Sequence, residues 1–167
     1  YKELLDHVNT GESKLRRQTP LVNAGYAARV LAISHSIQSF VAYHQQRNNN
    51  KSSQILQIVL LGCGADVIGM WAHSLLDPSS NTKIRIVEMD MTEVCSVKRD
   101  VWIRNHLVDP IHTTEESSER LVGHIRNHSS DQSDATTGVP FNYVLCPVDL
   151  RDISQLDQVV QEFIDID

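Results

Sequence analysis

The chain has 167 residues, of which 41% are hydrophobic and 22% are charged, and its formal net charge is −6 at pH 7. These values are ordinary for a soluble protein, and the length is sufficient for one small domain with its own core. The acidic excess argues against non-specific binding to nucleic acid, which needs a basic face, although it is compatible with a local basic patch.

The three cysteines, Cys63, Cys95 and Cys146, are too few and too dispersed for a disulfide framework or a zinc cluster. We therefore expect a reducing compartment such as the cytoplasm. No apolar run approaches the roughly 20 residues of a membrane span, and no signal peptide is visible. Because the sequence starts at Tyr1 and not at a methionine, we expect a fragment or a processed piece of a longer protein.

Helices are predicted at the start of the chain. Apolar residues indicate a helix within residues 1–15, which the polar segment 16–20 ends. Over residues 25–43 apolar side chains recur at helical spacing, which predicts a second helix with one apolar stripe. Residues 45–53 include three consecutive asparagines and predict a solvent loop.

Strands and helices then alternate. The near-continuous apolar character of residues 55–61 predicts a central parallel strand that is covered on both faces. Further strands are predicted over residues 83–89 and 142–148, and helices over residues 66–76, 92–107 and 152–163. This alternation predicts an α/β fold with a parallel sheet and right-handed crossovers. Three strands are half of a typical doubly wound sheet, so we expect the other half beyond Asp167.

Residues 112–138 interrupt this alternation. They are rich in Ser, Thr, Glu, Asp and His and predict an inserted surface loop, with at most a short helix around residues 121–125. Residues 108–110 are expected to end the preceding helix. His124 and His128 have a spacing that can bind metal on a helix, but no acid or cysteine completes a site, so we interpret them as solvated.

The first strand runs into a turn that contains Gly62 and Gly64. Glycine lets the backbone pass close to a ligand, and ligands of open α/β sheets bind at the carboxyl ends of the strands. A dinucleotide fingerprint needs a third glycine, where this chain has Val67. The pattern therefore favours S-adenosylmethionine, which has no pyrophosphate, over NAD. The alternative is a tight turn without a ligand, with Cys63 as a small residue in it and not a nucleophile.

Two acids close the second strand. Glu88 and Asp90 lie two residues apart, so an extended strand directs them to the same face. An acid at this position accepts hydrogen bonds from ribose hydroxyls, and Asp90 is the better candidate because it is nearer the tip. The alternative is a pair of solvated acids.

Three further residues are candidates. Asp149 follows the third strand and can accept a hydrogen bond from an adenine amino group, while Leu150 offers an apolar edge to the ring. Asp152 or Ser154 can cap the helix that follows. Arg29 is either a solvated surface arginine or a bidentate partner for a carboxylate of cofactor or substrate.

In this order, the motifs resemble those of the leucine carboxyl methyltransferase family. They are Gly-Tyr-x-x-Arg over residues 25–29, Leu-Gly-x-Gly-x-Asp over residues 61–66, an acidic strand tip over residues 88–90 with a trailing Lys98, and Asp-Leu-Arg over residues 149–151. The resemblance covers approximately residues 1–110 and 141–163. It implies the N-terminal half of a class I S-adenosylmethionine-dependent methyltransferase with a Rossmann-like fold. Residues 1–50 would be leading helices, 51–110 and 139–167 cofactor-binding βα units, and 111–138 an inserted polar loop.

The resemblance also implies roles for individual residues. Arg29 would hold the cofactor's carboxylate, and Gly62 would lie beneath its methionine portion, with Gly64 in the same turn. Asp90 would bind the ribose, and Asp149 with Leu150 would hold the adenine. It assigns no catalytic residue and no metal ligand within this chain.

The methyl acceptor differs between branches of the family. One branch methylates the C-terminal leucine carboxylate of the protein phosphatase 2A catalytic subunit, and residues 88–94 are closer to that branch. The other modifies wybutosine in tRNA. A carboxylate is already ionised at pH 7, so its methylation needs no general base. A third hypothesis is a non-catalytic S-adenosylmethionine-binding or interaction domain, which Ala24 and the absence of the family's acidic fourth-strand motif favour.

Overall fold

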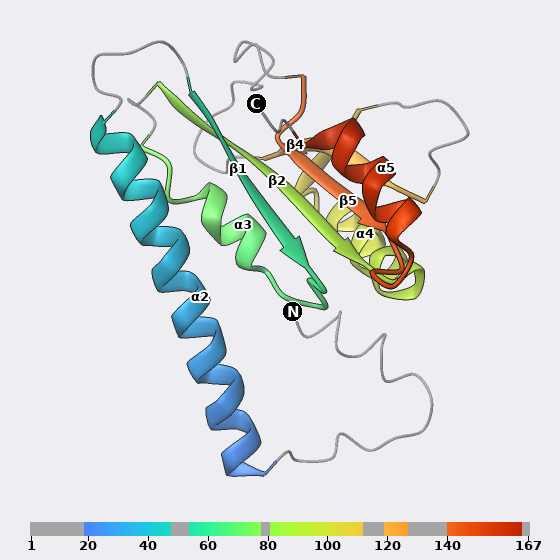
Figure 1. Ribbon diagram of the computed structural model, residues 1–167, viewed down its shortest axis with the longest axis horizontal. Coiled ribbons are helices and arrows are strands. Elements are labelled where there is room, and N and C mark those ends of the chain that lie inside the picture. The colour runs from blue at the N-terminus through green and yellow to red at the C-terminus, as the bar shows by residue number, and fades with distance from the viewer. Residues whose placement is uncertain (1–18, 48–53, 78–80, 112–118, 127–139, 165–167) are drawn as a thin grey trace.

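A computed structural model describes residues 19–47, 54–77, 81–111, 119–126 and 140–164. Within these residues a five-stranded sheet has the order β1-β2-β5-β4-β3 (Figure 1). Strands β1 (Gln54–Leu61), β2 (Thr82–Asp90) and β5 (Tyr143–Pro147) are parallel. Strands β4 (Leu121–Ile125) and β3 (Val108–Pro110) extend the sheet in antiparallel fashion beyond β5. The predicted α/β fold with a parallel sheet is confirmed for β1, β2 and β5.

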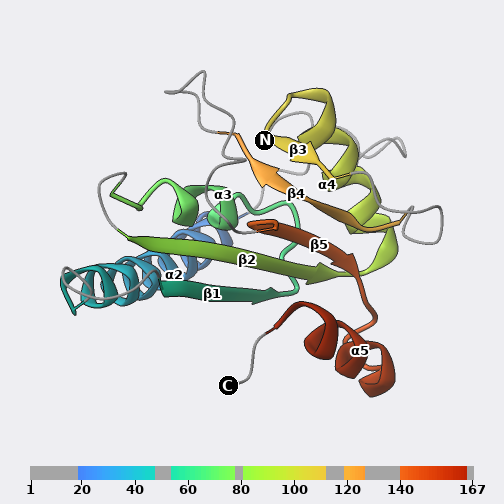
Figure 2. The ribbon, with the colours of Figure 1, turned by 90° about the horizontal axis from the view of Figure 1, so that it is seen from above.

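Helices cover both faces of the sheet. Side chains of α2 (Pro20–Arg47), α3 (Ile68–His73) and α4 (Thr92–Arg104) join one apolar cluster on one face. Helix α5 (Ile153–Phe163) packs on the opposite face through Val159 and Phe163. Figure 2 shows α5 on one side of the strands and α3 and α4 on the other.

Strand β2 is almost completely buried. It lies between β1 and β5, and its residues from Ile84 to Met89 are all buried. Strand β1 differs from the prediction of a strand covered on both faces. Leu56 and Ile58 are buried, whereas Val59 and Leu61 are 37% and 58% exposed. The prediction was wrong for the described residues because β1 pairs there with β2 alone, at the edge of the sheet.

The predicted inserted loop contains a strand. Residues 121–125 form β4 and not a short helix, and residues 108–110 form β3 and not a helix end. In β4 the buried residues Leu121, Gly123 and Ile125 alternate with half-buried ones, which is the period of a strand. Gly123 packs against the backbone of Asp109 on β3. Five residues gave too short a pattern to distinguish strand from helix.

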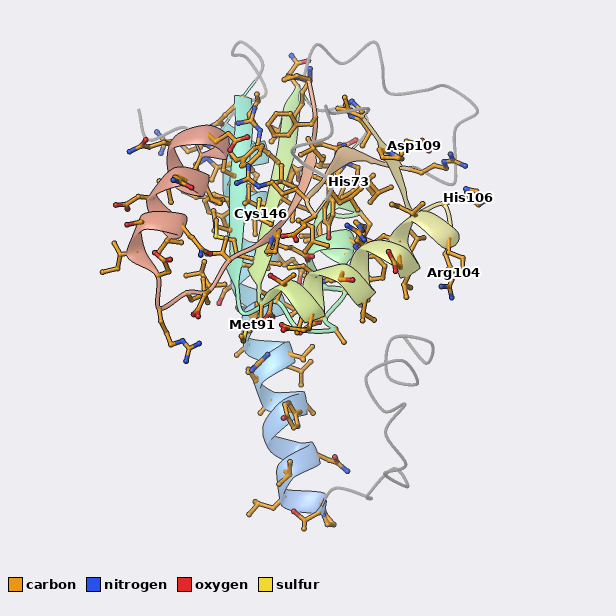
Figure 3. The ribbon with its side chains drawn as sticks, turned by 90° about the vertical axis from the view of Figure 1, so that its right-hand side faces the viewer. His73, Met91, Arg104, His106, Asp109 and Cys146 are labelled. Carbon is orange, nitrogen blue, oxygen red and sulfur yellow. The ribbon has the colours of Figure 1, made fainter. Side chains whose placement is uncertain are left out.

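Helix α2 is longer than predicted and less buried. It spans Pro20–Arg47, and only Ile37 and Val41 are fully buried, while Tyr26 is 56% exposed. Its C-terminal half packs on the sheet, and its N-terminal half extends past the carboxyl ends of the strands (Figures 1 and 3). The predicted apolar stripe is therefore buried only in part. The helix predicted within residues 1–15 lies outside the described residues.

The remaining elements are close to prediction. Helix α5 begins and ends as expected, and α3 and α4 are shorter than predicted at 68–73 and 92–104. None of the helices in the described residues is long and apolar enough to cross a membrane.

Candidate functional site

The carboxyl ends of the three parallel strands meet at one edge of the sheet. Leu61 of β1 is paired with Met89 of β2, and Asp90 is paired with Pro147 of β5. The residues that follow each strand are therefore neighbours, as the sequence predicted. Figure 3 labels Met91, the residue directly after β2, at this edge.

The glycine turn is joined to the end of β2. The backbone N–H groups of Gly62 and Cys63 donate to the Met89 carbonyl, at 2.8 and 3.2 Å. Gly62 and Gly64 have φ values of 65° and 53°, which favour glycine over other residues. A Cβ added to either glycine would meet no described heavy atom within 4 Å. The turn therefore needs glycine for its backbone conformation and leaves open space beside it, which fits a bound ligand.

The Asp90 carboxylate is hydrogen-bonded to this turn. Its Oδ2 accepts a hydrogen bond from the Gly64 N–H at 2.6 Å, and its Oδ1 accepts one from the Met91 N–H at 2.7 Å. Each carboxylate oxygen has two lone pairs, so both oxygens keep one acceptor site for a ribose hydroxyl. Asp90 therefore fits the predicted role and also orders the glycine turn.

Glu88 is not a second ribose-binding acid. It is fully buried, and its Oε2 lies 2.7 Å from the Nζ of Lys98 on α4. The interpretation of two solvated acids is also wrong for this residue. The sequence correctly placed Glu88 and Asp90 on one face of β2. An acid that faces the core needs a buried cation beside it, and the sequence did not show that Lys98 supplies one.

Asp149 and Leu150 follow β5 at the same edge. Leu150 is 38% exposed and can offer an apolar surface. The Asp149 carboxylate is bound to Arg151, whose Nε and Nη2 donate at 2.9 and 2.7 Å. Asp152 caps α5, because its Oδ1 accepts from the N–H groups of Ser154 and Gln155. This confirms the predicted cap.

The Asp149–Arg151 pair has a measurable effect on titration. The hydrogen bonds from Arg151 lower the pKa of Asp149 from 3.8 to about 2. Because the folded-state pKa is depressed, the contribution of this pair to stability is present above about pH 4 and is lost as the pH falls through about 2. In Arg151→Ala we expect the Asp149 pKa to return toward its ordinary value, measured by carboxyl ¹³C NMR titration. An unchanged low pKa would mean that Arg151 is not its cause.

Arg29 is the candidate residue that lies on α2. It lies in the exposed N-terminal part of α2 and forms no ion pair among the described residues. The packed residues of α2 are in its C-terminal half, around Ile37 and Val41. Its predicted contact with a ligand carboxylate remains a prediction.

The cysteines provide no nucleophile. Burial raises the pKa of the Cys63 and Cys146 thiols to about 12 and that of Cys95 to about 11. All three are free and buried, so they are protonated at neutral pH. This agrees with the interpretation of Cys63 as a small residue of the turn. In the described part of the chain no three His, Cys, Asp or Glu residues are grouped as metal ligands.

Sequence reasoning missed a buried polar cluster behind the turn. Lys98, Trp102 and Tyr143 surround Glu88, and all four side chains are almost completely buried. One signal was available: Lys98 lies on the same face of α4 as Cys95, Val101 and Trp102, which are its buried residues. A lysine in an otherwise apolar helical stripe predicts a buried partner.

Comparison with known proteins gives the family. The family model described as "Leucine carboxyl methyltransferase" matches residues 2–163. The chain belongs to the leucine carboxyl methyltransferase family, and its mostly parallel sheet is that of a Rossmann-like methyltransferase fold. It is 30% identical over 162 residues to the "Leucine carboxyl methyltransferase 1 homolog" of Arabidopsis thaliana. The alignment includes 97% of this chain and 41% of that relative, so the chain spans less than half of the relative's length.

Proposed function

We propose that this chain binds S-adenosylmethionine at the carboxyl ends of β1, β2 and β5 and forms the cofactor-binding part of a carboxyl O-methyltransferase. The observation that carries the proposal is the glycine turn, which is hydrogen-bonded to Asp90 through the Gly64 N–H and has open space at both glycines. A ligand with a ribose and no phosphate suits this arrangement, since Asp90 lies beside the turn and the turn lacks the third glycine of a dinucleotide site.

The described residues have defined tasks in this proposal. Asp90 accepts hydrogen bonds from the ribose while it holds the Gly64 N–H, and Leu150 covers one edge of the adenine. Asp149 accepts from the adenine amino group with the one Oδ2 lone pair that Arg151 leaves free. Arg29 binds the cofactor's carboxylate if α2 approaches the bound ligand.

The chemistry of the family supports a carboxylate as the methyl acceptor. S-adenosylmethionine, when bound, supplies an electrophilic methyl group on a sulfonium. A carboxylate attacks such a group directly and needs no general base, so the protein aligns the two reactants and excludes water. We propose the C-terminal leucine carboxylate of the protein phosphatase 2A catalytic subunit as the acceptor, on the support of the family match and of residues 88–94.

Asp90→Ala is expected to weaken S-adenosylmethionine binding by about tenfold or more, because a hydrogen bond to a charged group contributes about 1.5–3 kcal/mol. Calorimetric titration of the variant and of the unmodified chain measures this loss. The matched control is Asp100→Ala, which removes an exposed acid of α4 that pairs with the neighbouring Arg99. Equal affinity in all three proteins would sink the assignment of Asp90.

The acceptor is tested with radiolabelled cofactor and three substrates. They are a peptide that ends in a free leucine carboxylate, the same peptide with an amidated C-terminus, and tRNA, and the Arabidopsis relative is assayed in parallel. Transfer to the free carboxylate alone supports the proposal. Transfer to tRNA would favour the tRNA-modifying branch, and cofactor binding without transfer to any substrate would favour a binding domain.

A further inference from the structure

A buried ion pair lies directly behind the glycine turn. Lys98 Nζ and Glu88 Oε2 are 2.7 Å apart, and their side chains are 0% and 1% exposed. The Tyr143 hydroxyl donates to the same oxygen at 2.6 Å, and Trp102 Nε1 donates to the Tyr143 oxygen at 2.8 Å. The cluster thus joins β2, α4 and β5. These are the elements whose ends form the site.

The second oxygen of Glu88 faces α3. Glu88 Oε1 has no hydrogen-bond partner among the described residues, and it lies 2.5 Å from the position that a Cβ on Gly69 would occupy. The absence of a side chain at Gly69 therefore makes room for the carboxylate. α3 follows the glycine turn in the chain, and β1, whose Leu60 is paired with Glu88, precedes it. Glu88 therefore adjoins the elements on both sides of the turn.

The ion pair joins β2 to α4 across the junction at which Asp90 lies. Glu88 is two residues before Asp90 on β2, and Lys98 is in the second turn of α4, which begins at Thr92. The Cys95 thiol adds a second link, donating to the Asp90 carbonyl at 3.4 Å. Lys98 also acts on the turn itself, since its charge lowers the pKa of Cys63 and offsets part of the effect of burial.

Stability alone does not explain a charged pair at this place. Two charges are costly to bury, and apolar residues of similar volume often replace such a pair without loss of stability. An ion pair with a short, directed contact differs from an apolar pair in fixing the distance and orientation of the groups that it joins. Here the groups that it joins are the end of β2 and the start of α4.

We propose that Glu88 and Lys98 are positioning residues, which fix the loop between β2 and α4 so that Asp90 and the glycine turn are preorganised for the methyl donor. This inference rests on the proposed binding of S-adenosylmethionine. Neither residue touches the cofactor, because both are enclosed by α3, α4 and β5. They act through Asp90 and the backbone of Gly64.

The test uses the double variant Glu88→Gln with Lys98→Met. It removes both charges, keeps the side-chain volumes, and leaves an amide oxygen that accepts from Tyr143. The unfolding midpoint is measured first, and S-adenosylmethionine is then titrated by calorimetry at a temperature where near-UV circular dichroism shows native packing. We expect a midpoint close to that of the unmodified chain and affinity about tenfold lower. The matched control, Arg120→Met, breaks the exposed pair with Glu162 and should leave the affinity unchanged.

The outcomes separate the two proposals. If the unmodified chain does not bind S-adenosylmethionine, the proposed function itself fails. If the unmodified chain binds and a folded double variant binds equally well, the ion pair is only structural and the inference is overturned. If the double variant does not fold, Tyr143→Phe decides, since it removes one hydrogen bond onto Glu88: weaker binding by about threefold supports the inference, and unchanged binding overturns it.

Discussion

Lys98→Ala is expected to lower the free energy of unfolding by about 3–5 kcal/mol, because it leaves the Glu88 carboxylate buried without its cation. Most of this decrease in stability comes from the uncompensated charge of Glu88. The variant also removes the contact between the Lys98 ammonium and the Trp102 ring, whose centroid lies 5.5 Å away. Urea unfolding followed by Trp fluorescence measures the change.

The comparison variant for this prediction is Arg120→Ala. Arg120 and Glu162 are 2.6 Å apart, close to the 2.7 Å of Lys98 and Glu88. Their side chains are 29% and 51% exposed, so we expect a loss of no more than about 1 kcal/mol. An equal decrease in the free energy of unfolding for Lys98→Ala and Arg120→Ala would show that the burial of Glu88 does not affect stability.

Replacing glycine with alanine is expected to destabilise the protein at Gly123 and to stabilise it at Gly25. Gly123→Ala places a Cβ against the Asp109 carbonyl oxygen of β3 and 2.7 Å from Val108 Cγ1, so it should destabilise the protein by about 1–3 kcal/mol. Gly25 lies in helix α2, where an added Cβ meets nothing within 4 Å. Gly25→Ala should therefore stabilise the helix by up to about 1 kcal/mol.

Thermal unfolding of the two variants beside the unmodified chain tests both signs. The crowded atom at Gly123 is backbone and cannot rotate away, so β3 and β4 must separate to admit the methyl group. An unchanged midpoint for Gly123→Ala would mean that the hairpin moves without cost and does not belong to the cooperative core.

The parallel part of the sheet was predictable because its signals are long and agree with one another. Residues 55–61 form a nearly continuous apolar run and residues 83–89 are rich in Ile, Val and Met, and each segment is followed by turn residues or acids that mark a strand end. From parallel pairing alone, the glycine turn, Asp90 and Asp149 were expected at one edge, and the register of β1, β2 and β5 places them there. The capping role of Asp152 was predictable for the same local reason.

Other features depend on contacts that no local pattern contains. The strand β4 was missed because its five residues are surrounded by polar sequence, and its partner β5 lies about 20 residues away in the chain. The role of Glu88 was missed because the partner that neutralises it comes from the second turn of a helix. The exposure of β1 was missed because an apolar run shows only that a strand can be covered on both faces. It does not show which segment of the chain covers each face.

The three buried thiols provide internal reporters of local opening. Cys63 is in the glycine turn, Cys95 is in the first turn of α4, and Cys146 is near the end of β5. A thiol reagent modifies such a cysteine only when the segment around it opens. Pulsed alkylation with mass spectrometry can therefore rank the opening free energies of the three segments that converge on the site, with no engineered label.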